Sequence, residues 1–342
     1  MAVTLQDVAD AAGVSRSTAS RAMSGSAVIS AQTRSRVESA AAQLGYRVNR
    51  MASALRSNRS HLIGLVLNNL INASFHTIAE VVQRRAHDEG YQVILTITDA
   101  DPRREQDLLE TLGDHHVDGV IVIGTGQNAS TSNQLLRSGV AVVNVIRSPA
   151  ESAAPAVLAA DHDGAHTAVR HLLGLGHRTI AYIGGPPGTN SGDERYAGYL
   201  TALQEHGLSV DEQLVARGPF EPAFGAEAVE ALLSRRSDIT ALLAANHEAT
   251  FGLLPALVNR HIRFPEQLSL ICYEDMPWLA CWQPAITVVD NGPREMADLA
   301  MDLLLQQIAD PVHSAGRRRR TYRVGAALIE RDSCRPVGVP VG

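Results

Sequence analysis

The sequence predicts a small all-α N-terminal domain with a linking helix, followed by an α/β core of two doubly wound parallel sheets. Three observations support this fold class. Residues 4–46 show helical periodicity with helix-capping residues, and no strand pattern. From residue 61 onward, apolar runs alternate with amphipathic helical segments, which is typical of parallel α/β sheets. Residues 1–60 hold eight arginines and three acidic residues, a net charge of +5. Since the whole chain has a net charge of −6, the remaining residues carry −11.

The first two predicted helices form a helix-turn-helix. Thr4 and Asp7 match a capping box, and Gly13 ends the first helix after about two turns. Ser15 can cap a second helix that continues to Met23. Small alanines on both segments allow the two helices to cross closely, as this motif requires.

A third helix follows, capped by Ser30, and its Val37, Ala41 and Leu44 are expected to close a small core against the first two helices. The next stretch, residues 48–61, is polar, basic and only weakly amphipathic. Such a short isolated segment is not a stable helix by itself. We expect it to fold only on a partner.

The basic N-terminal domain is expected to meet a polyanion. In a helix-turn-helix the start of the second helix enters the DNA major groove, which here exposes Arg16 and Ser17, with Arg21 one turn further on. Arginine suits a bidentate contact with guanine. Ser15 and Ser20, together with the helix N-terminal amides, can hold phosphates.

The run VTLQDVADAAGVSRSTASRAMSG, followed by VISAQTRSRVESAAAQLGYRVNRMASALRS, resembles the N-terminus of the lactose/galactose-repressor (LacI/GalR) family of bacterial transcription regulators. The resemblance implies a homodimer that reads two half-sites of a near-palindromic double-stranded operator. It also implies a hinge helix that inserts Leu55 into the minor groove. The residues expected to contact DNA are Thr4, Ser15, Arg16, Ser17, Ser20, Arg21, Ser30, Thr33, Asn49, Ala52, Leu55 and Arg56.

Three positions depart from the family pattern without removing the motif. Ala19, Ser24 and Val48 stand where the family usually has Val, Asn and Pro. These departures affect packing, one backbone contact and the entry to the hinge. The chain ends in CRPVGVPVG, without the family's leucine-rich tetramerisation helix, and we therefore expect a dimer.

The core is expected to contain two sheets, formed by about residues 61–158 and 159–289. Residues 290–320 are expected to cross back to the first lobe, and residues 321–335 to complete the second. The predicted domains are thus 1–47 (helix-turn-helix), 48–60 (hinge helix) and 61–342 (core). This organisation resembles the family's periplasmic-binding-protein-like core, in which an effector binds between two hinged lobes.

Several other classes are not supported by the sequence. There is no apolar run long enough to span a membrane, and the N-terminus lacks the layout of a secretory signal. Three cysteines without CxxC spacing indicate reduced thiols and a cytoplasmic protein, associated with the nucleoid when bound to DNA. Dinucleotide, phosphate-loop and nucleophile-elbow motifs are incomplete or missing, so neither an enzyme nor a cofactor is expected.

Two clusters have alternative interpretations. His162 and His166 lie one turn apart and could share a metal ion, but structural roles are favoured for them and for the nearby His171 and His177, so no metal is expected. The arginine run 317–320 is interpreted as a solvated loop before a strand rather than as a second DNA-binding patch.

The resemblance also implies an effector site at the strand ends. Arg195, in an RxxG pattern, is the leading candidate because its fork of donors suits hydroxyl or carboxylate oxygens. Arg147, Trp278 and His162 are further candidates to border the site. The residues carried over from the family positions are Phe75, Asn144, Ser191, Arg195, Phe220, Asn246 and Glu274.

Two of these positions differ in chemistry from the family. Asn246 is followed by His247 instead of Asp, and Glu274 replaces a shorter carboxylate. These side chains predict a small polar effector. A sugar or sugar derivative is the leading candidate, and a nucleoside, purine or acidic metabolite is the alternative. The predicted function is an effector-responsive DNA-binding transcription regulator, most simply a repressor. The alternative is a sugar-binding or transport receptor with the same core.

Overall fold

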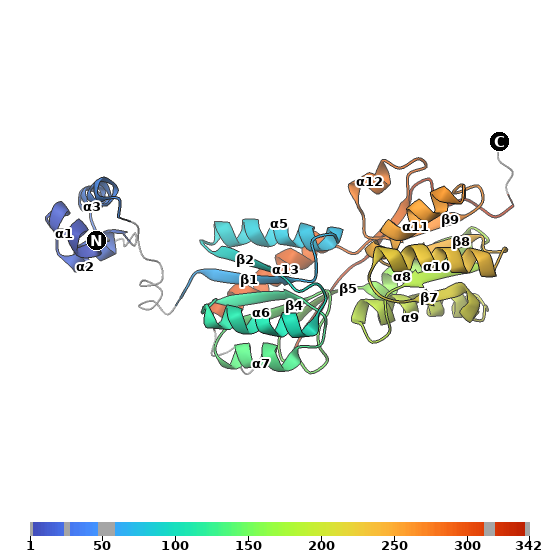
Figure 1. Cartoon of the computed structure of the whole chain (residues 1–342), viewed down its shortest axis with the longest axis horizontal. Coiled ribbons are helices and arrows are strands. Elements are labelled where there is room, and N and C mark those ends of the chain that lie inside the picture. The colour runs from blue at the N-terminus through green and yellow to red at the C-terminus, as the bar shows by residue number, and fades with distance from the viewer. Residues whose placement is uncertain (1–2, 24–27, 47–58, 311–318, 339–342) are drawn as a thin grey trace. The chain divides into compact units, whose positions relative to one another are not determined.

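The computed structural model describes residues 3–23, 28–46, 59–310 and 319–338 (Figure 1). The chain divides into two compact units, Met1–Ser60 and His61–Gly342. No helix in the described ranges has the length and apolar character needed to cross a membrane.

The described residues of the N-terminal unit form three helices, α1 (Leu5–Ala12), α2 (Arg16–Met23) and α3 (Ala31–Leu44). The predicted caps are confirmed. The amide of Asp7 donates to the Thr4 hydroxyl, and the Thr4 amide donates to the Asp7 carboxylate at 2.8 Å. Gly13, at φ 62°, ends α1 in the left-handed conformation that glycine adopts without strain.

Small side chains build the core of this unit. Ala9 and Ala19 are fully buried and belong to the same cluster as Val37, so the helices cross with little between their backbones. The prediction for Leu44 is wrong, because this residue is 38% exposed. It is the last residue of α3, whereas Ala40, one turn earlier, is buried in the cluster.

The first lobe of the core is a six-stranded sheet in the order β11-β5-β4-β3-β1-β2, with every neighbouring pair parallel. One face packs against α5 and α13, and the other against α6 and α7. Strand β2 is only half-buried because it lies at the sheet edge. The elements are β1 (Leu62–Leu67), α5 (Ala73–Asp88), β2 (Gln92–Ile97), α6 (Pro102–Asp114), β3 (Gly119–Ile123), α7 (Ala129–Arg137), β4 (Ala141–Val145), β5 (Ala156–Ala159), α13 (Pro293–Ala309) and β11 (Thr321–Val324).

The second lobe is also a six-stranded sheet covered by helices (Figure 1), and its strand order is β12-β10-β9-β8-β6-β7. Helices α8 and α9 pack together on one face of the sheet, and α10 and α11 on the other. The elements are α8 (Asp161–Gly174), β6 (Ile180–Gly184), α9 (Asn190–Glu205), the 3-10 turn η1 (Glu212–Leu214), β7 (Val215–Arg217), α10 (Pro222–Arg235), β8 (Ala241–Ala244), α11 (His247–Asn259), β9 (Ser269–Tyr273), α12 (Pro277–Ala280), β10 (Thr287–Asp290) and β12 (Ala327–Ile329). The predicted fold class, an α-helical N-terminal domain before two doubly wound sheets, is confirmed.

The chain passes between the lobes at three places, near residues 160, 291–292 and 325–326. The last crossing corrects one expected boundary. Residues 321–324 form β11, which pairs with β5 of the first sheet, and only β12 returns to the second sheet, antiparallel to β10. Pairing with β11 satisfies the backbone groups along the outer edge of β5 before the chain crosses.

Candidate DNA-binding surface and effector site

The start of α2 presents an exposed arginine and serine beside the serine that caps the helix. The Ser15 hydroxyl accepts a hydrogen bond from the Thr18 amide at 3.1 Å and lies 2.9 Å from the Ser17 hydroxyl. Arg16 and Ser17 are exposed. The partial positive charge of the helix N-terminus attracts phosphate, and the guanidinium can reach a base edge. This end of α2 therefore has the chemistry of a DNA-reading surface.

The other predicted DNA contacts lie elsewhere in the described part of the N-terminal unit or outside the described residues. Arg21 is exposed one turn after Ser17, and Ser20 is half-exposed. The hydroxyls of Thr4, Ser30 and Thr33 take part in the caps of α1 and α3. Outside the described residues lie Ser24, Val48, Asn49, Ala52, Leu55 and Arg56.

Arg195 of α9 is buried in an ion pair. Its Nε donates to the Asp161 carboxylate at 2.6 Å, its Nη1 donates to the Ala245 carbonyl at 2.8 Å, and its guanidinium lies 3.9 Å from the Tyr273 ring centre. Burial alone would lower the pKa of Arg195, but the Asp161 carboxylate raises it overall. The guanidinium is therefore held charged and in one orientation at the carboxyl ends of β8 and β9.

Glu274 and Glu248, both of the second lobe, accept hydrogen bonds from the start of α5 in the first lobe. Ser74 donates to Glu274 at 2.8 Å, and the Asn72 amide group donates to Glu248 at 3.1 Å. The same Ser74 hydroxyl lies 3.2 Å from the Asn291 side-chain oxygen. Burial and the charge of Glu274 raise the pKa of Glu248 to about 7. The two lobes thus meet through buried carboxylates.

Asn246 and His247 begin α11 beside these carboxylates. The Asn246 side-chain oxygen caps the helix by accepting from the Ala249 amide at 2.6 Å. Its side-chain nitrogen and both ring nitrogens of His247 are buried and make no hydrogen bond of normal geometry within the described structure. Burial lowers the pKa of His247, which keeps the imidazole neutral at pH 7, although Glu274 acts in the opposite direction.

Arg147 follows β4 in the first lobe and meets Phe220, which follows β7 in the second. The guanidinium lies 4.4 Å from the centre of the Phe220 ring. Burial is the main cause that lowers the pKa of Arg147. The structure thus brings Arg195, Asn246, Glu274 and Phe220 to the strand ends, together with Arg147.

The remaining predicted effector residues lie deeper. Phe75 is part of the first-lobe core between its sheet and α13. The Asn144 side chain donates to the Ser152 hydroxyl at 3.1 Å, and Ser191 is buried in the first turn of α9. In this structure these three side chains have packing or local bonding roles.

The sequence analysis missed Asn72, Ser74, Asp161 and Glu248. Each follows the end of a strand or begins the next helix, as do Asn246 and Glu274. Ligands of doubly wound sheets bind at these positions, so a search of every strand end would have found them.

The further candidates fall in different places. The imidazoles of His162 and His166 stack, with ring centres 6.0 Å apart, and bond to Thr201 and Glu205 on α9. Within the described residues no group of three or more His, Cys, Asp or Glu is arranged to hold a metal ion. Trp278 packs edge-on against Phe251 rather than beside Arg195.

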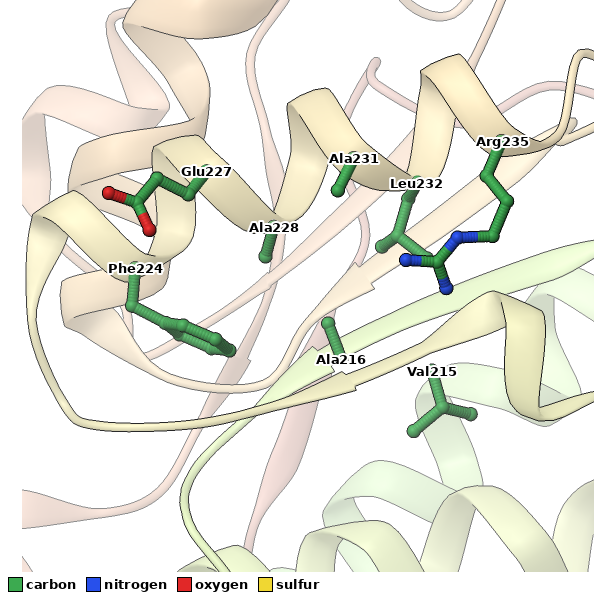
Figure 2. A pocket seen from close by; sticks show the side chains of 8 residues that line it. All are labelled: Val215, Ala216, Phe224, Glu227, Ala228, Ala231, Leu232 and Arg235. Atoms are coloured by element: carbon green, nitrogen blue, oxygen red, sulfur yellow. The ribbon is translucent and has the colours of Figure 1, made fainter.

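A shallow pocket of about 230 Å³ lies inside the second lobe, away from these residues. Figure 2 shows Phe224, Ala228 and Leu232 of α10 over Val215 and Ala216 of β7. None of the predicted effector residues lines it. Its apolar walls hold few polar groups that could orient a polar ligand.

Comparison with known proteins identifies the family. The profile described as "Bacterial regulatory proteins, lacI family" matches residues 4–49, and that of a "Periplasmic binding protein-like domain" matches residues 169–334. The chain is 30% identical over 296 residues to the HTH-type transcriptional regulator AscG of Escherichia coli (strain K12), covering 86% of this chain and 88% of AscG.

Two solved structures extend the similarity over nearly the whole chain. The transcriptional regulator CelR in complex with cellobiose is 28% identical with a TM-score of 0.72, covering 97% of this chain and 99% of CelR. The lac repressor dimer bound to operator and the anti-inducer ONPF is 25% identical with a TM-score of 0.84, covering 98% and 100%.

The exposed helix-turn-helix and the two-lobed core define a DNA-binding transcription regulator. The chain belongs to the LacI family of bacterial regulatory proteins. Members of this family are transcription regulators rather than enzymes, and these similarities favour a regulator over a transport receptor.

Proposed function

We propose that this regulator reads a near-palindromic operator with the exposed start of α2, in the manner of a repressor. The observation that supports this most is the exposure of Arg16 and Ser17 beside the capped N-terminus of α2. In this proposal Arg16 contacts base edges, the surrounding serines and amides hold phosphates, and Leu55 of the hinge enters the minor groove.

An electrophoretic mobility shift with an operator selected from random duplexes tests this assignment. Arg16→Ala should weaken specific binding roughly 5- to 150-fold, the value of one bidentate arginine–guanine contact. Arg294→Ala, an exposed arginine of the core, serves as the control and should bind like the wild type. Binding should also weaken steeply with salt, because phosphate contacts release counterions. Full specific binding by Arg16→Ala would refute the recognition-helix assignment.

The effector site of the proposal is the buried polar group where the lobes meet. Arg195 and Glu274 offer fixed donors and acceptors there, and Asn246 has a side-chain nitrogen without a partner in the described structure. The similar regulator CelR was solved with cellobiose, which favours a sugar or sugar derivative over a nucleoside or purine. Effector binding would change the arrangement of the two lobes relative to each other. This change would in turn alter the positions of the hinge segments.

The proposed dimer would use an exposed apolar surface on the second lobe. Phe251 and Val258 of α11 are 45% and 49% exposed, and the half-buried Trp278 and Trp282 continue the surface, with 5.6 Å between the ring centres of Phe251 and Trp278 and 5.9 Å between those of Trp278 and Trp282. We call these four residues the α11 aromatic patch. Contiguous exposed apolar residues mark interfaces. The similar lac repressor was solved as a dimer, which supports a second copy of this chain as the partner. A regulator of transcription would work in the cytoplasm, at the nucleoid when bound to its operator.

A further inference from the structure

Arg147 is a buried cation without a carboxylate partner. It is 8% exposed, and within the described residues its guanidinium makes one hydrogen bond, a long one of 3.4 Å from Nη1 to the Gly124 carbonyl. Its Nε is buried without a hydrogen bond, and no carboxylate oxygen in the described residues lies within the 4.0 Å of an ion pair. Burying an unpaired charge is costly, so such a group normally has a partner.

Arg195 shows how this protein satisfies a buried arginine within its own fold. Its Nε and Nη1 are bonded to the Asp161 carboxylate and the Ala245 carbonyl. Arg147 has no equivalent of Asp161. The difference leaves Arg147 as the buried guanidinium in this group that can accept a new anionic partner.

The Phe220 ring leaves the hydrogen-bonding edge of Arg147 available. A ring at 4.4 Å covers a face of the planar guanidinium. The N–H groups point outward in the plane, and Nε, one of them, has no acceptor. A carboxylate or phosphate binds along this edge with two parallel hydrogen bonds.

The charges that act on Arg147 come from Glu248, Arg195, Glu274 and Glu105. Each carboxylate already accepts a hydrogen bond. Glu105 accepts from the Thr125 amide at 2.5 Å, Glu274 from Ser74 and Glu248 from Asn72. Because the pKa of Glu248 is raised to about 7, a proton on this group reduces its repulsion of an anion near neutral pH.

We propose that the effector is an anionic, oxygen-rich small molecule, a sugar acid or sugar phosphate, whose carboxylate or phosphate pairs with Arg147. The inference rests on the proposed effector site between the lobes. The Asn246 side-chain nitrogen and the His247 ring nitrogens, which make no hydrogen bond of normal geometry within the described structure, would supply contacts to its other oxygens. Arg147 would thereby select a negatively charged ligand, while Arg195 remains paired with Asp161.

Thermal-shift and calorimetry measurements on the full chain test this with matched probes. The pairs are D-gluconate against D-glucitol, and D-glucose 6-phosphate against D-glucose, which separate a carboxylate from a phosphate ligand. The charged member of at least one pair should raise Tm and bind, and its neutral member should not. Arg147→Gln should weaken that binding roughly 10- to 100-fold, as expected for lost charge-assisted hydrogen bonds.

Further variants separate ligand binding from folding. Arg147→Met retains the apolar stem, so the free protein should keep or gain stability while the ligand-induced rise in Tm is lost. Arg147→Lys should bind more weakly than the wild type but better than Arg147→Gln. Arg294→Gln is the control. The proposal is overturned if no charged probe binds, if neutral probes bind as well, or if Arg147→Gln binds like the wild type. A neutral effector that alters operator binding would leave the proposed function intact.

Discussion

Arg195 and Asp161 form an ion pair of 2.6 Å in which each side chain is only 4% exposed. The pair joins the first turn of α8 to α9, and the Ala245 carbonyl and Tyr273 ring hold the guanidinium on its other sides. Arg195 is thus part of the internal structure of the second lobe as well as a candidate effector contact. Removing it should therefore lower the stability of this lobe as well as test the proposed effector contact.

Asp161→Asn should lower the free energy of unfolding by about 3–5 kcal/mol, because it leaves the Arg195 charge buried without its partner. Urea-induced unfolding of the full chain, followed by circular dichroism, measures the change. Asp163→Asn, two residues away with a 79% exposed side chain, is the matched control and should change stability by less than about 0.5 kcal/mol. In Arg195→Met/Asp161→Asn the losses should be smaller than the sum of the single losses. Additive losses would contradict a coupled pair.

Glu248→Gln should stabilise the protein at neutral and alkaline pH. Burial raises the folded-state pKa of Glu248 from 4.5 to about 7, so the folded chain binds more protons than the unfolded chain between these values. Stability from the protonated carboxyl is complete below about pH 4.5 and is lost as pH rises through 7. Glutamine does not ionise and keeps the contact with Asn72, so the variant should gain up to about 3 kcal/mol above pH 7.

The measurement is the difference in unfolding free energy between Glu248→Gln and the wild type from pH 4.5 to 8.5. The difference should be small at the acid end and level off above pH 7. Glu151→Gln, at an exposed loop position, should show no such trend. A difference that is constant with pH would contradict a raised pKa for Glu248. Comparison with the wild type cancels the effect of His247, whose lowered pKa changes stability at acid pH in both proteins.

Phe251→Glu should convert the proposed dimer into a monomer, because it places a charge in the centre of the α11 aromatic patch. Analytical ultracentrifugation at micromolar concentration should show the wild type at twice the monomer mass. The variant should bind a full operator much more weakly, since two half-sites need two recognition helices. Val337→Glu alters a similarly exposed apolar residue, 48% accessible, outside the patch, and should remain dimeric. A dimeric Phe251→Glu would place the interface elsewhere.

The sequence allowed the fold to be predicted almost element by element, because helix caps and buried strands are local signals. Gly13, Ser30 and the apolar run of β1 could each be interpreted without knowledge of the rest of the chain. The error at Leu44 arose because periodicity does not reveal where a neighbouring helix ends. The pairing of β11 with β5 could not be predicted, since a strand of four residues carries no signal for its sheet.

The candidate site was predicted less completely, because it depends on which strand ends meet across the lobes. The resemblance pointed to Arg195 but not to Asp161, which lies 34 residues earlier in the sequence. Asn72 and Ser74 resemble ordinary helix caps, and only the packing of the lobes brings them to Glu248 and Glu274. Long-range pairs of this kind leave no pattern in a single sequence.

The close contact between α9 and α8 requires a glycine at position 198, three residues after Arg195. A Cβ at this position would lie 2.2 Å from the His162 carbonyl oxygen and 3.1 Å from the Ala165 Cβ, so glycine allows α9 to touch α8. Gly198→Ala should push the helices apart and stretch the Arg195–Asp161 pair, with a loss of about 1–3 kcal/mol in unfolding free energy. Gly174→Ala in α8 meets nothing within 4 Å and should be neutral or slightly stabilising.

If α9 positions Arg195 through the contact at Gly198, Asp161→Asn should lower the unfolding free energy less in the Gly198→Ala background than in the wild type. An equal cost in both backgrounds would show that the pair forms independently of the close helix contact.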